Sequence, residues 1–399
     1  MTIALWAPRV DPAFAAVIDA AVAAAVAPDA ERIDREDVYP LAAVQALARA
    51  GLTAAGFPIE DGGGGRPLRD LVAVFEAVAA ASAATATSLV TIFQAGAAIQ
   101  LFGGEALRRR YLPRIAAGLV CSFAMTEARG GSDVRHLDTR ARRGDGGWVI
   151  DGRKAFVTSA SAAELFVLLA QTDAGVTAFA VPADAPGLAL AVTPATRTIG
   201  LRNGPHVDLT LDGVRIPDDH RIGEDGHGVR AAATVLDHSR VLVAAIGCGI
   251  ARAAFDGALA FADHRVVGDR HVIELQGIQW YLAELLAEID AARLLTYEAA
   301  SHLDAAGPTH HLPREAPARR AGLLDIQRWS ASAKLVATRT AVHAALQAIQ
   351  ICGVRGCLET APFGRYLRDA KTYEIAGGSS EVLKNTLGDY LVAAVDGPG

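Results

Sequence analysis

The stretch FAMTEARGGSD, residues 123–133, marks the point where the pattern of the 399-residue chain changes. Before it, Ala-, Leu- and Val-rich segments with helical periodicity alternate with Pro and Gly breakers. This pattern predicts helices over 12–27, 40–51, 68–82, 84–103 and 105–118. The stretch itself combines two hydroxyl side chains with two glycines, so its backbone can closely approach a flat polar ring or a phosphate. Taken alone, the stretch is best interpreted as a turn-rich connection from a helix to a strand, and it becomes a candidate ligand-contacting loop only together with the segments described below.

The chain after this stretch favours β-structure. Short apolar or alternating runs cover 148–150, 165–170, 177–181, 188–192 and 207–211. The pairs Asp145-Gly146, Asp151-Gly152 and Asp212-Gly213 separate several of them and are typical of tight turns between antiparallel strands. These features predict an antiparallel β-barrel or β-sandwich of about 100 residues.

Long helical patterns return after Gly228, over 230–263, 274–304, 320–352 and 380–395, with a loop at 305–318. They predict a C-terminal four-helix bundle. The fold class is therefore α+β, with a helical domain at 1–119, a β-domain at 120–228 and a helical bundle at 229–399. The glycine cluster at 61–65 is interpreted as a loop, because neither a preceding strand nor a following Lys-Ser/Thr pair supports a phosphate loop.

Composition excludes several functions. The net charge of −6 gives no basic surface for nucleic acid or anionic membranes. The most apolar run, 241–251, is shorter than the roughly 20 residues that span a bilayer. Four cysteines without CxxC spacing suit a reducing cytoplasm, and the histidines show no metal-binding spacing. The 51% of apolar residues and the mean hydropathy of +0.25 indicate apolar surface buried between subunits.

Six further segments follow the opening stretch in a fixed order. They are GRKAFVTS at 152–159, LDHSR at 236–240, Arg265 with Gln276, QICG at 350–353, RDAK at 368–371 and YEIAGGSSEV at 373–382. Together, the seven segments resemble the acyl-CoA dehydrogenase family over residues 35–395. Each segment is a weak signal alone, and the common order and spacing carry the resemblance.

The resemblance implies a homotetramer, or dimer of dimers, with one FAD per subunit between the β-domain and the C-terminal helices. It assigns the flavin and substrate side of the site to Phe123, Met125, Thr126, Gly131, Ser132, Phe156, Val157 and Thr158. It assigns the ADP half, partly from a neighbouring subunit, to Arg265, Gln276, Gln350, Gly353, Ser379 and Glu381. Arginines and backbone donors suit phosphates, and an aromatic face suits the flavin ring. No metal is implied.

The carboxylate base of the family is missing from this sequence. Family chemistry removes a proton from the carbon α to a thioester while a hydride passes to the flavin. Most members place the Glu where this chain has Gly377, whereas isovaleryl-type members, closest in the C-terminal motif, place it where this chain has Ser239. The adjacent Arg240 either polarises the thioester carbonyl or forms a structural ion pair. The segments 265–269 and 350–354 also depart from the family patterns R-x-x-F-G and Q-x-x-G-G.

Three functions remain open on these residues. The first is an FAD-dependent dehydrogenase with an atypical base, acting on an acyl thioester of CoA or a carrier protein, or on a β-keto acid, in secondary metabolism. The second is a flavin monooxygenase or oxidase, in which reduced flavin captures O₂ and no α-proton base is needed. The third is one chain of a hetero-oligomer whose partner supplies the Glu. The electron acceptor is accordingly a flavoprotein or O₂.

Overall fold

The computed structural model describes residues 5–6, 9–191, 197–307 and 317–396. The chain folds into two compact units. The helical unit comprises Met1–Glu31, Arg66–Ala86 and Arg240–Gly399, and the sheet unit comprises Arg32–Gly65 and Thr87–Ser239. The N-terminal helices are thus shared between both units, and the domain boundaries expected at 119/120 and 228/229 stay a prediction.

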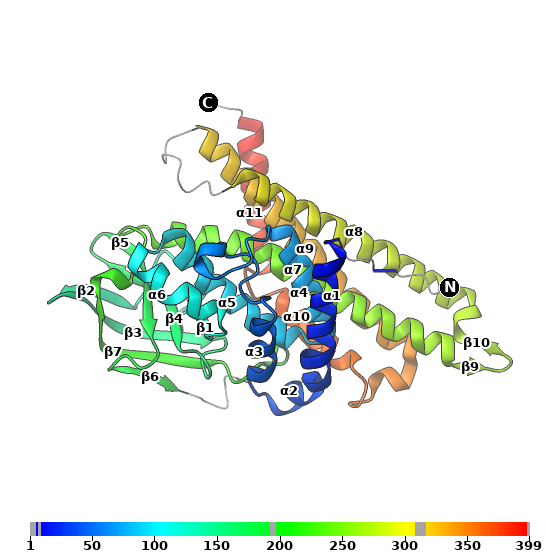
Figure 1. The fold of residues 1–399 in the computed structure, drawn as a ribbon. Helices are drawn as coiled ribbons and strands as arrows, with labels where there is room; N and C mark the ends of the chain where they lie inside the picture. The colour runs from blue at the N-terminus through cyan, green and yellow to red at the C-terminus, as the bar shows by residue number, and fades with distance from the viewer. Residues whose placement is uncertain (1–4, 7–8, 192–196, 308–316, 397–399) are drawn as a thin grey trace. The chain divides into compact units, whose positions relative to one another are not determined.

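The sheet unit is built on one sheet with the strand order β6-β7-β3-β2-β4-β5-β8, and β1 pairs with β4 (Figure 1). Its strands are β1 Cys121–Ala124, β2 Arg140–Gly144, β3 Gly147–Val157, β4 Leu165–Thr172, β5 Gly175–Pro182, β6 Leu188–Ala191, β7 Val207–Pro217 and β8 Arg221–Ile222. Its helices include α3 Leu41–Arg49, α5 Ala83–Phe102 and α6 Glu105–Ala116. The pairings are antiparallel as expected, except that β1 and β2 run parallel to β4.

Only one of the three Asp-Gly pairs forms a hairpin turn. Gly146, with φ of +76°, connects β2 to β3. Asp151-Gly152 and Asp212-Gly213 lie instead inside β3 and β7, at a register shift where the Gly213 N–H donates to the Asp151 carboxylate at 2.7 Å. The prediction of turns there was wrong because a β-bulge needs the same positive φ and small side chain as a turn. At Gly152 a Cβ atom would also lie 2.6 Å from the Thr139 backbone.

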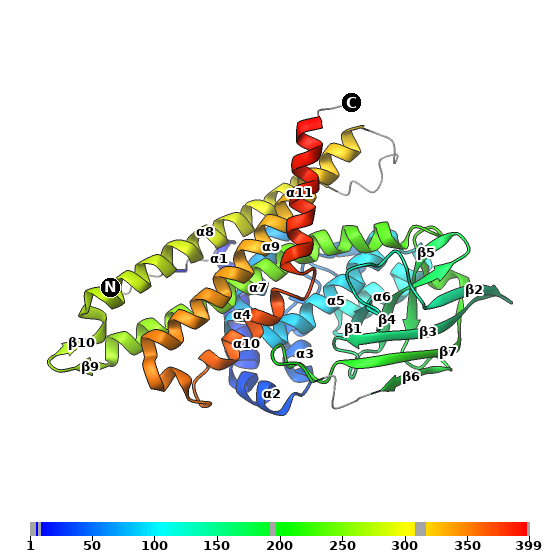
Figure 2. The same cartoon turned by 180° about the vertical axis from the view of Figure 1, so that it is seen from behind.

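The helical unit contains α1 Pro12–Ala21, α4 Leu68–Ala81, α8 Gln276–Ala306, α9 Pro317–Cys352, α10 Phe363–Tyr373, α11 Ser380–Asp396 and most of α7 Gly228–His264. Helices α7, α8 and α9 run side by side in both views (Figures 1 and 2). Glu76 of α4 is buried, and its Oε1 lies 2.6 Å from Arg293 of α8 and 3.0 Å from Arg252 of α7. This buried ion-pair network ties α4 to the long C-terminal helices.

The C-terminal region differs from the expected four helices. Its described part holds a fifth helix, α10, where the sequence showed only the motif RDAK at 368–371. Its buried residues Phe363, Asp369, Ala370 and Tyr373 recur at helical spacing, but Gly364 and four charged side chains hide the pattern in sequence. The first predicted helix, over 12–27, is also interrupted: after Ala21 the chain forms a π-helical turn and then a 3₁₀ turn at Ala27–Asp29, where Pro28 has no N–H. Most of the expected 305–318 loop lies outside the described residues.

Among the residues that the structure describes, three segments are long and apolar enough to cross a membrane, by length and composition: Pro12–Glu36, Ala83–Phe102 and Gly228–His264. Polar residues interrupt each of them, so none is an uninterrupted apolar run of about 20 residues. In the structure, 78% of the most apolar window of the latter two segments is buried inside the protein, against 28% for the first. Burial in the protein interior explains the hydropathy of α5 and α7. The absence of membrane insertion stays a prediction.

Candidate functional site

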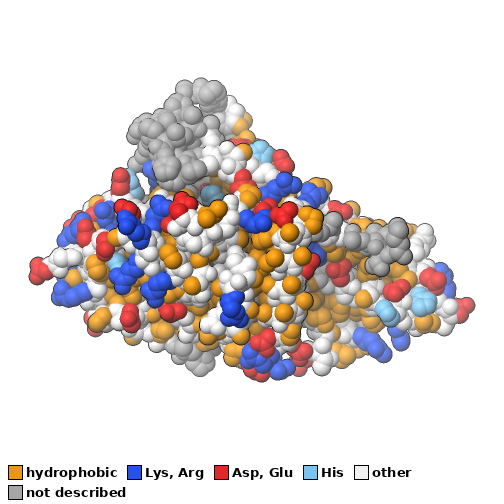
Figure 3. Space-filling model, in the orientation of Figure 1, with side chains coloured by type: hydrophobic (Ala, Val, Ile, Leu, Met, Phe, Trp, Pro, Cys, Tyr) orange, Lys and Arg blue, Asp and Glu red, His pale blue; other side chains and the backbone are white. Residues whose placement is uncertain are grey.

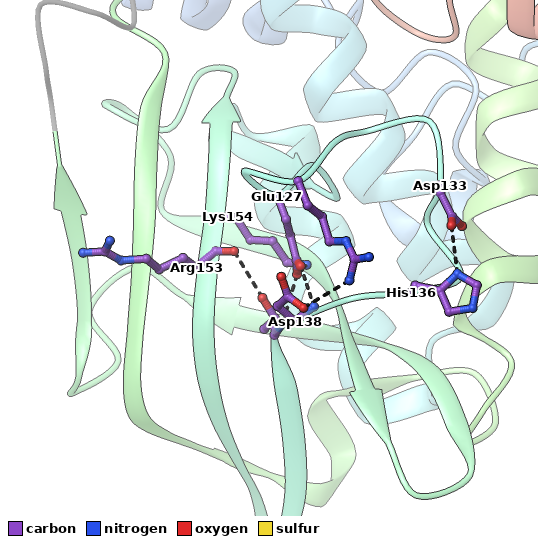
Figure 4. A network of polar contacts seen from close by, with 8 residues as sticks. Glu127, Asp133, His136, Asp138, Arg153 and Lys154 are labelled. Atoms are coloured by element: carbon purple, nitrogen blue, oxygen red, sulfur yellow. Dashed lines mark hydrogen bonds and ion pairs between the residues drawn. The ribbon is translucent and has the colours of Figure 1, made fainter.

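The opening stretch of the sequence forms a loop that is fixed by a buried ion pair in the sheet unit (Figure 4). The Lys154 ammonium of β3 lies 2.7 Å from Glu127 Oε1, and both side chains are buried. The same carboxylate accepts backbone N–H bonds from Asp138 at 2.6 Å and Thr139 at 3.1 Å. Glu127 therefore closes the loop 127–139 on itself and attaches it to β3.

The charge state of this pair follows from its contacts. Burial raises the pKa of Glu127, but hydrogen bonds from Lys154, Thr139 and Asp138 outweigh it and leave the pKa below its ordinary value. Burial lowers the pKa of Lys154, against the opposing effect of Glu127. Since the carboxylate accepts at least three hydrogen bonds, we take the ionised Glu127 as the resting form.

Phe156 is presented to the surface by a bulge at the end of β3. The register against β7 shifts between Lys154 and Val157, and Phe156 adopts φ of +54° with 57% of its surface exposed. Such a backbone conformation is strained for an aromatic residue. The Phe156 N–H donates to Asp208 Oδ1 of β7 at 3.2 Å, which holds the strained backbone in place. An exposed aromatic face is the feature expected of a residue that contacts the flavin ring.

The structure brings the two expected flavin-contacting segments together. The Ala155 N–H donates to the Thr126 carbonyl at 2.9 Å, so the 123–133 loop and the 156–158 tripeptide are neighbours. Gly131 lies so close to Thr126 that a Cβ atom would be 2.9 Å from its Oγ1. Most of the predicted residues on this side are half-buried or exposed: Phe123, Met125, Thr126, Gly131, Ser132 and Thr158. Val157 is the exception, because its side chain is buried in the sheet core and only its backbone is left for a ligand.

Ser239, one of the two positions for the base, is engaged in hydrogen bonds within the sheet unit. Its Oγ donates to the Leu236 carbonyl at 3.1 Å and accepts from Gln94 Nε2 of α5 at 3.1 Å. Its side chain is buried. The hydroxyl proton is thus given to the backbone, and the group beside it is a neutral carboxamide. Neither group is a base at neutral pH.

Gly377, the other position for the base, lies in a turn of the helical unit between α10 and α11. Gly377 and Gly378 have φ of +72° and +100°. The Arg240 Nε donates to the Gly377 carbonyl at 3.5 Å and the Lys334 ammonium to the Gly378 carbonyl at 2.6 Å. Burial, and then the nearby Arg240, lower the pKa of Lys334 to about 7, although Glu374 and Glu381 oppose the shift. The Lys334 side chain has no exposed surface, so it stabilises the turn from the protein interior.

The six residues expected around ADP occupy three places in the helical unit. Arg265 and Gln276 flank a short hairpin between α7 and α8, formed by β9 Val266–Val267 and β10 Arg270–His271. The Val272 N–H donates to the Arg265 carbonyl at 2.8 Å and closes this hairpin. Gln350 and Gly353 lie at the C-terminal end of α9, where Gly353 has φ of +58°. Ser379 precedes α11 and its Oγ accepts from the Val382 N–H at 3.4 Å, and Glu381 lies in the first turn. All six are exposed except Ser379, which is half-buried, so a ligand or a second subunit can reach them.

These residues fit FAD. The sheet unit offers an exposed aromatic side chain, a glycine with no room for a Cβ atom and exposed backbone donors beside it. The helical unit offers an exposed arginine and an exposed glutamine on the two sides of one hairpin, and such side chains suit a diphosphate and its sugar. Gln94, Asp208 and Lys334 also contact the predicted site residues or segments, but none of the three lies in a sequence motif that identified it as a site residue. One signal did exist: only four cations are Lys, and two of these, Lys154 and Lys334, are buried and fix the site loops.

The three family models of acyl-CoA dehydrogenases match successive parts of the chain. The N-terminal domain model covers residues 11–119, the middle domain model 122–214 and the C-terminal domain model 226–392. The chain therefore belongs to the acyl-CoA dehydrogenase family and is an FAD-dependent oxidoreductase. The predicted order of a helical, a β and a helical part is confirmed.

Individual relatives span nearly the whole chain. Probable acyl-CoA dehydrogenase FadE25 of Mycobacterium tuberculosis is 30% identical over 92% of this chain and 91% of its own length. The human mitochondrial short-chain specific acyl-CoA dehydrogenase is 32% identical over 92% of this chain and 86% of its own. Among solved structures, butyryl-CoA dehydrogenase from Megasphaera elsdenii superposes with a TM-score of 0.87 at 28% identity, covering 98% of this chain and 100% of the other. FkbI, for biosynthesis of the methoxymalonyl extender unit of the Fk520 polyketide, gives 0.83 at 26% identity, covering 94% and 99%.

Proposed function

We propose that this protein oxidises a short acyl thioester, carried by CoA or by a carrier protein, without the glutamate base of its family. The observation that carries the proposal is the chemistry at the two base positions. Ser239 gives its proton to a backbone carbonyl and faces a carboxamide, and Gly377 has no side chain. The short acyl group is inferred from the similarity to short-chain specific and butyryl-CoA dehydrogenases.

The chain's own residues would hold the cofactor and the substrate. Phe156, presented by its bulge, would cover the flavin ring, and the 126–133 loop would donate backbone and hydroxyl hydrogen bonds to ring and substrate. Arg265, Gln276, Gln350, Gly353, Ser379 and Glu381 would bind the ADP half. Bound FAD supplies a two-electron acceptor. Arg240, which directly follows Ser239, would stabilise negative charge on the thioester oxygen.

Without a carboxylate at 239 or 377, the substrate would provide its own carbanion. A β-keto acid does so by losing CO₂, and an electron-withdrawing substituent does so by acidifying the α-carbon. The similarity to FkbI, whose extender unit carries a polar substituent, supports a biosynthetic thioester over a plain fatty acyl chain. The electrons would then pass to an electron-transferring flavoprotein or to O₂.

A flavin monooxygenase or oxidase is the second candidate, favoured by the same absence of carboxylates at 239 and 377. Anaerobic mixing of the purified yellow protein with acyl thioesters separates the candidates. Direct bleaching of the flavin is expected for the dehydrogenase. If bleaching needs an external reductant and O₂ is consumed afterwards, the oxygenase is correct and the dehydrogenase is excluded.

The remaining expectations complete the proposal. We infer three domains with boundaries near 119/120 and 228/229, a cytoplasmic location and a homotetramer. A hetero-oligomer whose second chain supplies the Glu is the alternative. Expression of this chain alone as a tetramer with one FAD per subunit would exclude that alternative.

A further inference from the structure

Gln94 contacts Ser239, the position where the resemblance to isovaleryl-type members predicts the base. It lies on α5, 145 residues before Ser239 in sequence, and its Nε2 donates to Ser239 Oγ at 3.1 Å. Ser239 is 1% exposed, whereas Gln94 is only half-buried. Of this pair, the glutamine is therefore the member that a ligand can reach, and its carboxamide keeps an acceptor oxygen in addition to its donors.

Gln94 belongs to a row of polar residues on α5, a helix that also carries Thr85, Thr87 and Gln100. Ser88, Thr91 and Gln94 follow one another at three-residue spacing, which makes them neighbours on the helix surface. Ser88 Oγ accepts from Asn203 Nδ2 at 3.0 Å, and Thr91 Oγ1 donates to Ser159 Oγ at 3.1 Å. Ser159 directly follows the Phe156–Thr158 tripeptide. The row therefore runs from the predicted flavin-contacting segment to Ser239. The hydroxyl groups of its first two members, Ser88 and Thr91, have hydrogen-bond partners within the protein.

A hydrocarbon acyl chain is a poor partner for this surface. Covering a carboxamide with methylene groups removes its water without replacing the hydrogen bonds. A hydroxyl or amino group on the substrate would replace them, since each can donate to Gln94 Oε1 or accept from its amide. A site of this kind discriminates strongly, because analogues that lack the polar group leave the buried carboxamide unpaired.

We propose that Gln94 is a specificity-determining residue that hydrogen-bonds a hydroxyl or amino substituent on the α- or β-carbon of the acyl group. The natural substrate class is then a hydroxyacyl or aminoacyl thioester. The inference rests on the proposed function, because the position of Ser239 beside the reacting carbon comes from the family.

The test measures binding to the FAD-containing protein under anaerobic conditions. The probes are pantetheine thioesters of butyrate, 2-hydroxybutyrate, 3-hydroxybutyrate and 2-aminobutyrate, since the pantetheine arm is common to CoA and carrier proteins. Dissociation constants are read from the change in flavin absorbance. At least one substituted thioester should bind about 10- to 100-fold more tightly than butyryl-pantetheine, the range expected for a group that a polar site recognises.

Two variants connect the preference to the residue. Gln94→Leu should reduce the preference for the substituted thioester over butyryl-pantetheine to about threefold or less. Gln94→Met replaces it in the test if the leucine variant loses FAD. Gln100→Leu makes the same change on another face of α5 and should keep the preference. Equal binding of all four thioesters to the wild-type protein overturns the inference and leaves the proposed function intact. If none of them perturbs the flavin, the proposed function fails as well.

Discussion

Ser239 and Gly377 occupy the two positions where the family resemblance predicts a carboxylate, and polar side chains contact both residues. Gln94 binds the serine, and Lys334 and Arg240 bind the two carbonyls of the glycine turn. A position vacated by drift would be filled by water or apolar side chains. Here polar contacts fill both, which is consistent with a pocket adapted to another substrate.

Ser239→Glu tests whether the base is all that separates this protein from a conventional dehydrogenase. The new carboxylate would stand where isovaleryl-type members carry theirs. We expect dehydrogenase activity on a short branched acyl-CoA to rise at least tenfold, the lower range for general base catalysis being about 100-fold. Anaerobic flavin bleaching measures it.

Ser239→Gln is the matched control, because it has the same size as the glutamate and no basicity. Gly377→Glu offers the second base position, where a Cβ atom would meet only Val243 Cγ2 at 3.8 Å, although φ of +72° disfavours any side chain. If FAD stays bound and neither glutamate raises the rate, the pocket serves a different reaction.

At the scale of elements, bulges and one buried ion pair decide where the site loops lie. The β3 bulge exposes Phe156, and Glu127 with Lys154 attaches the 127–139 loop to the same strand. The bulge interrupts the regular pairing of β3 with β7, and the ion pair acts together with the backbone bonds that Glu127 accepts. Loss of the ion pair is therefore expected to destabilise the loop.

Glu127→Gln should lower the free energy of unfolding by about 3–5 kcal/mol at pH 7, because it leaves a buried ammonium without its partner. The folded-state pKa of Glu127 lies below the unfolded value of about 4.3. Its stabilisation is therefore complete above about pH 4.3 and is lost as the pH falls through the lower folded-state pKa. Urea unfolding at pH 7 and at progressively lower pH measures both effects.

The control for this prediction is another glutamate of the sheet unit. Glu164 is exposed and lies 4.0 Å from Arg114, so Glu164→Gln should cost less than about 1 kcal/mol at any pH. A loss of similar size in the two variants would show that the Glu127 pair does not anchor the loop. A difference that persisted unchanged to the lowest pH would contradict the pKa argument.

At the scale of the whole molecule, the surface carries both charged and large apolar side chains. Acidic and basic side chains are interspersed on the face shown in Figure 3, in keeping with the net charge of −6 and a small-molecule substrate. Large apolar side chains are nevertheless exposed on the C-terminal helices: Trp280, Tyr281 and Leu294 on α8, Leu346 on α9, and Leu391, Val392 and Val395 on α11. Apolar side chains such as Ile59 and Val354 are exposed elsewhere too, and the set on α8, α9 and α11 is our candidate for the proposed subunit interface.

If these side chains form the interface of the proposed tetramer, replacing Leu391 and Val395 by Asp should dissociate it. These two residues are 64% and 86% exposed and lie one helical turn apart on α11. The double variant should elute at a smaller mass in light scattering and retain its helix content. Lys384→Asp, an exposed charged site on the same helix, is the control. A monomeric wild-type protein, or a variant that stays tetrameric, would contradict the assignment of this interface.

The sequence alone predicted the order of helical and β parts and the family, which are confirmed, and the loss of both carboxylates, which stays a prediction. These properties depend on local periodicity and on residue identity at fixed spacing, and both can be read along the chain. Local pattern was insufficient at the Asp-Gly pairs, because a bulge and a turn use the same residues, and at α10, where surface charges concealed a short buried face.

Only the tertiary structure showed which groups surround the two expected base positions. Gln94 meets Ser239 across 145 residues, and Lys334 meets Gly378 across 44. Such contacts are set by how distant helices pack, which no local propensity specifies. The same holds for Asp208, which supports Phe156 from the neighbouring strand only because the β3 bulge shifts the register between them.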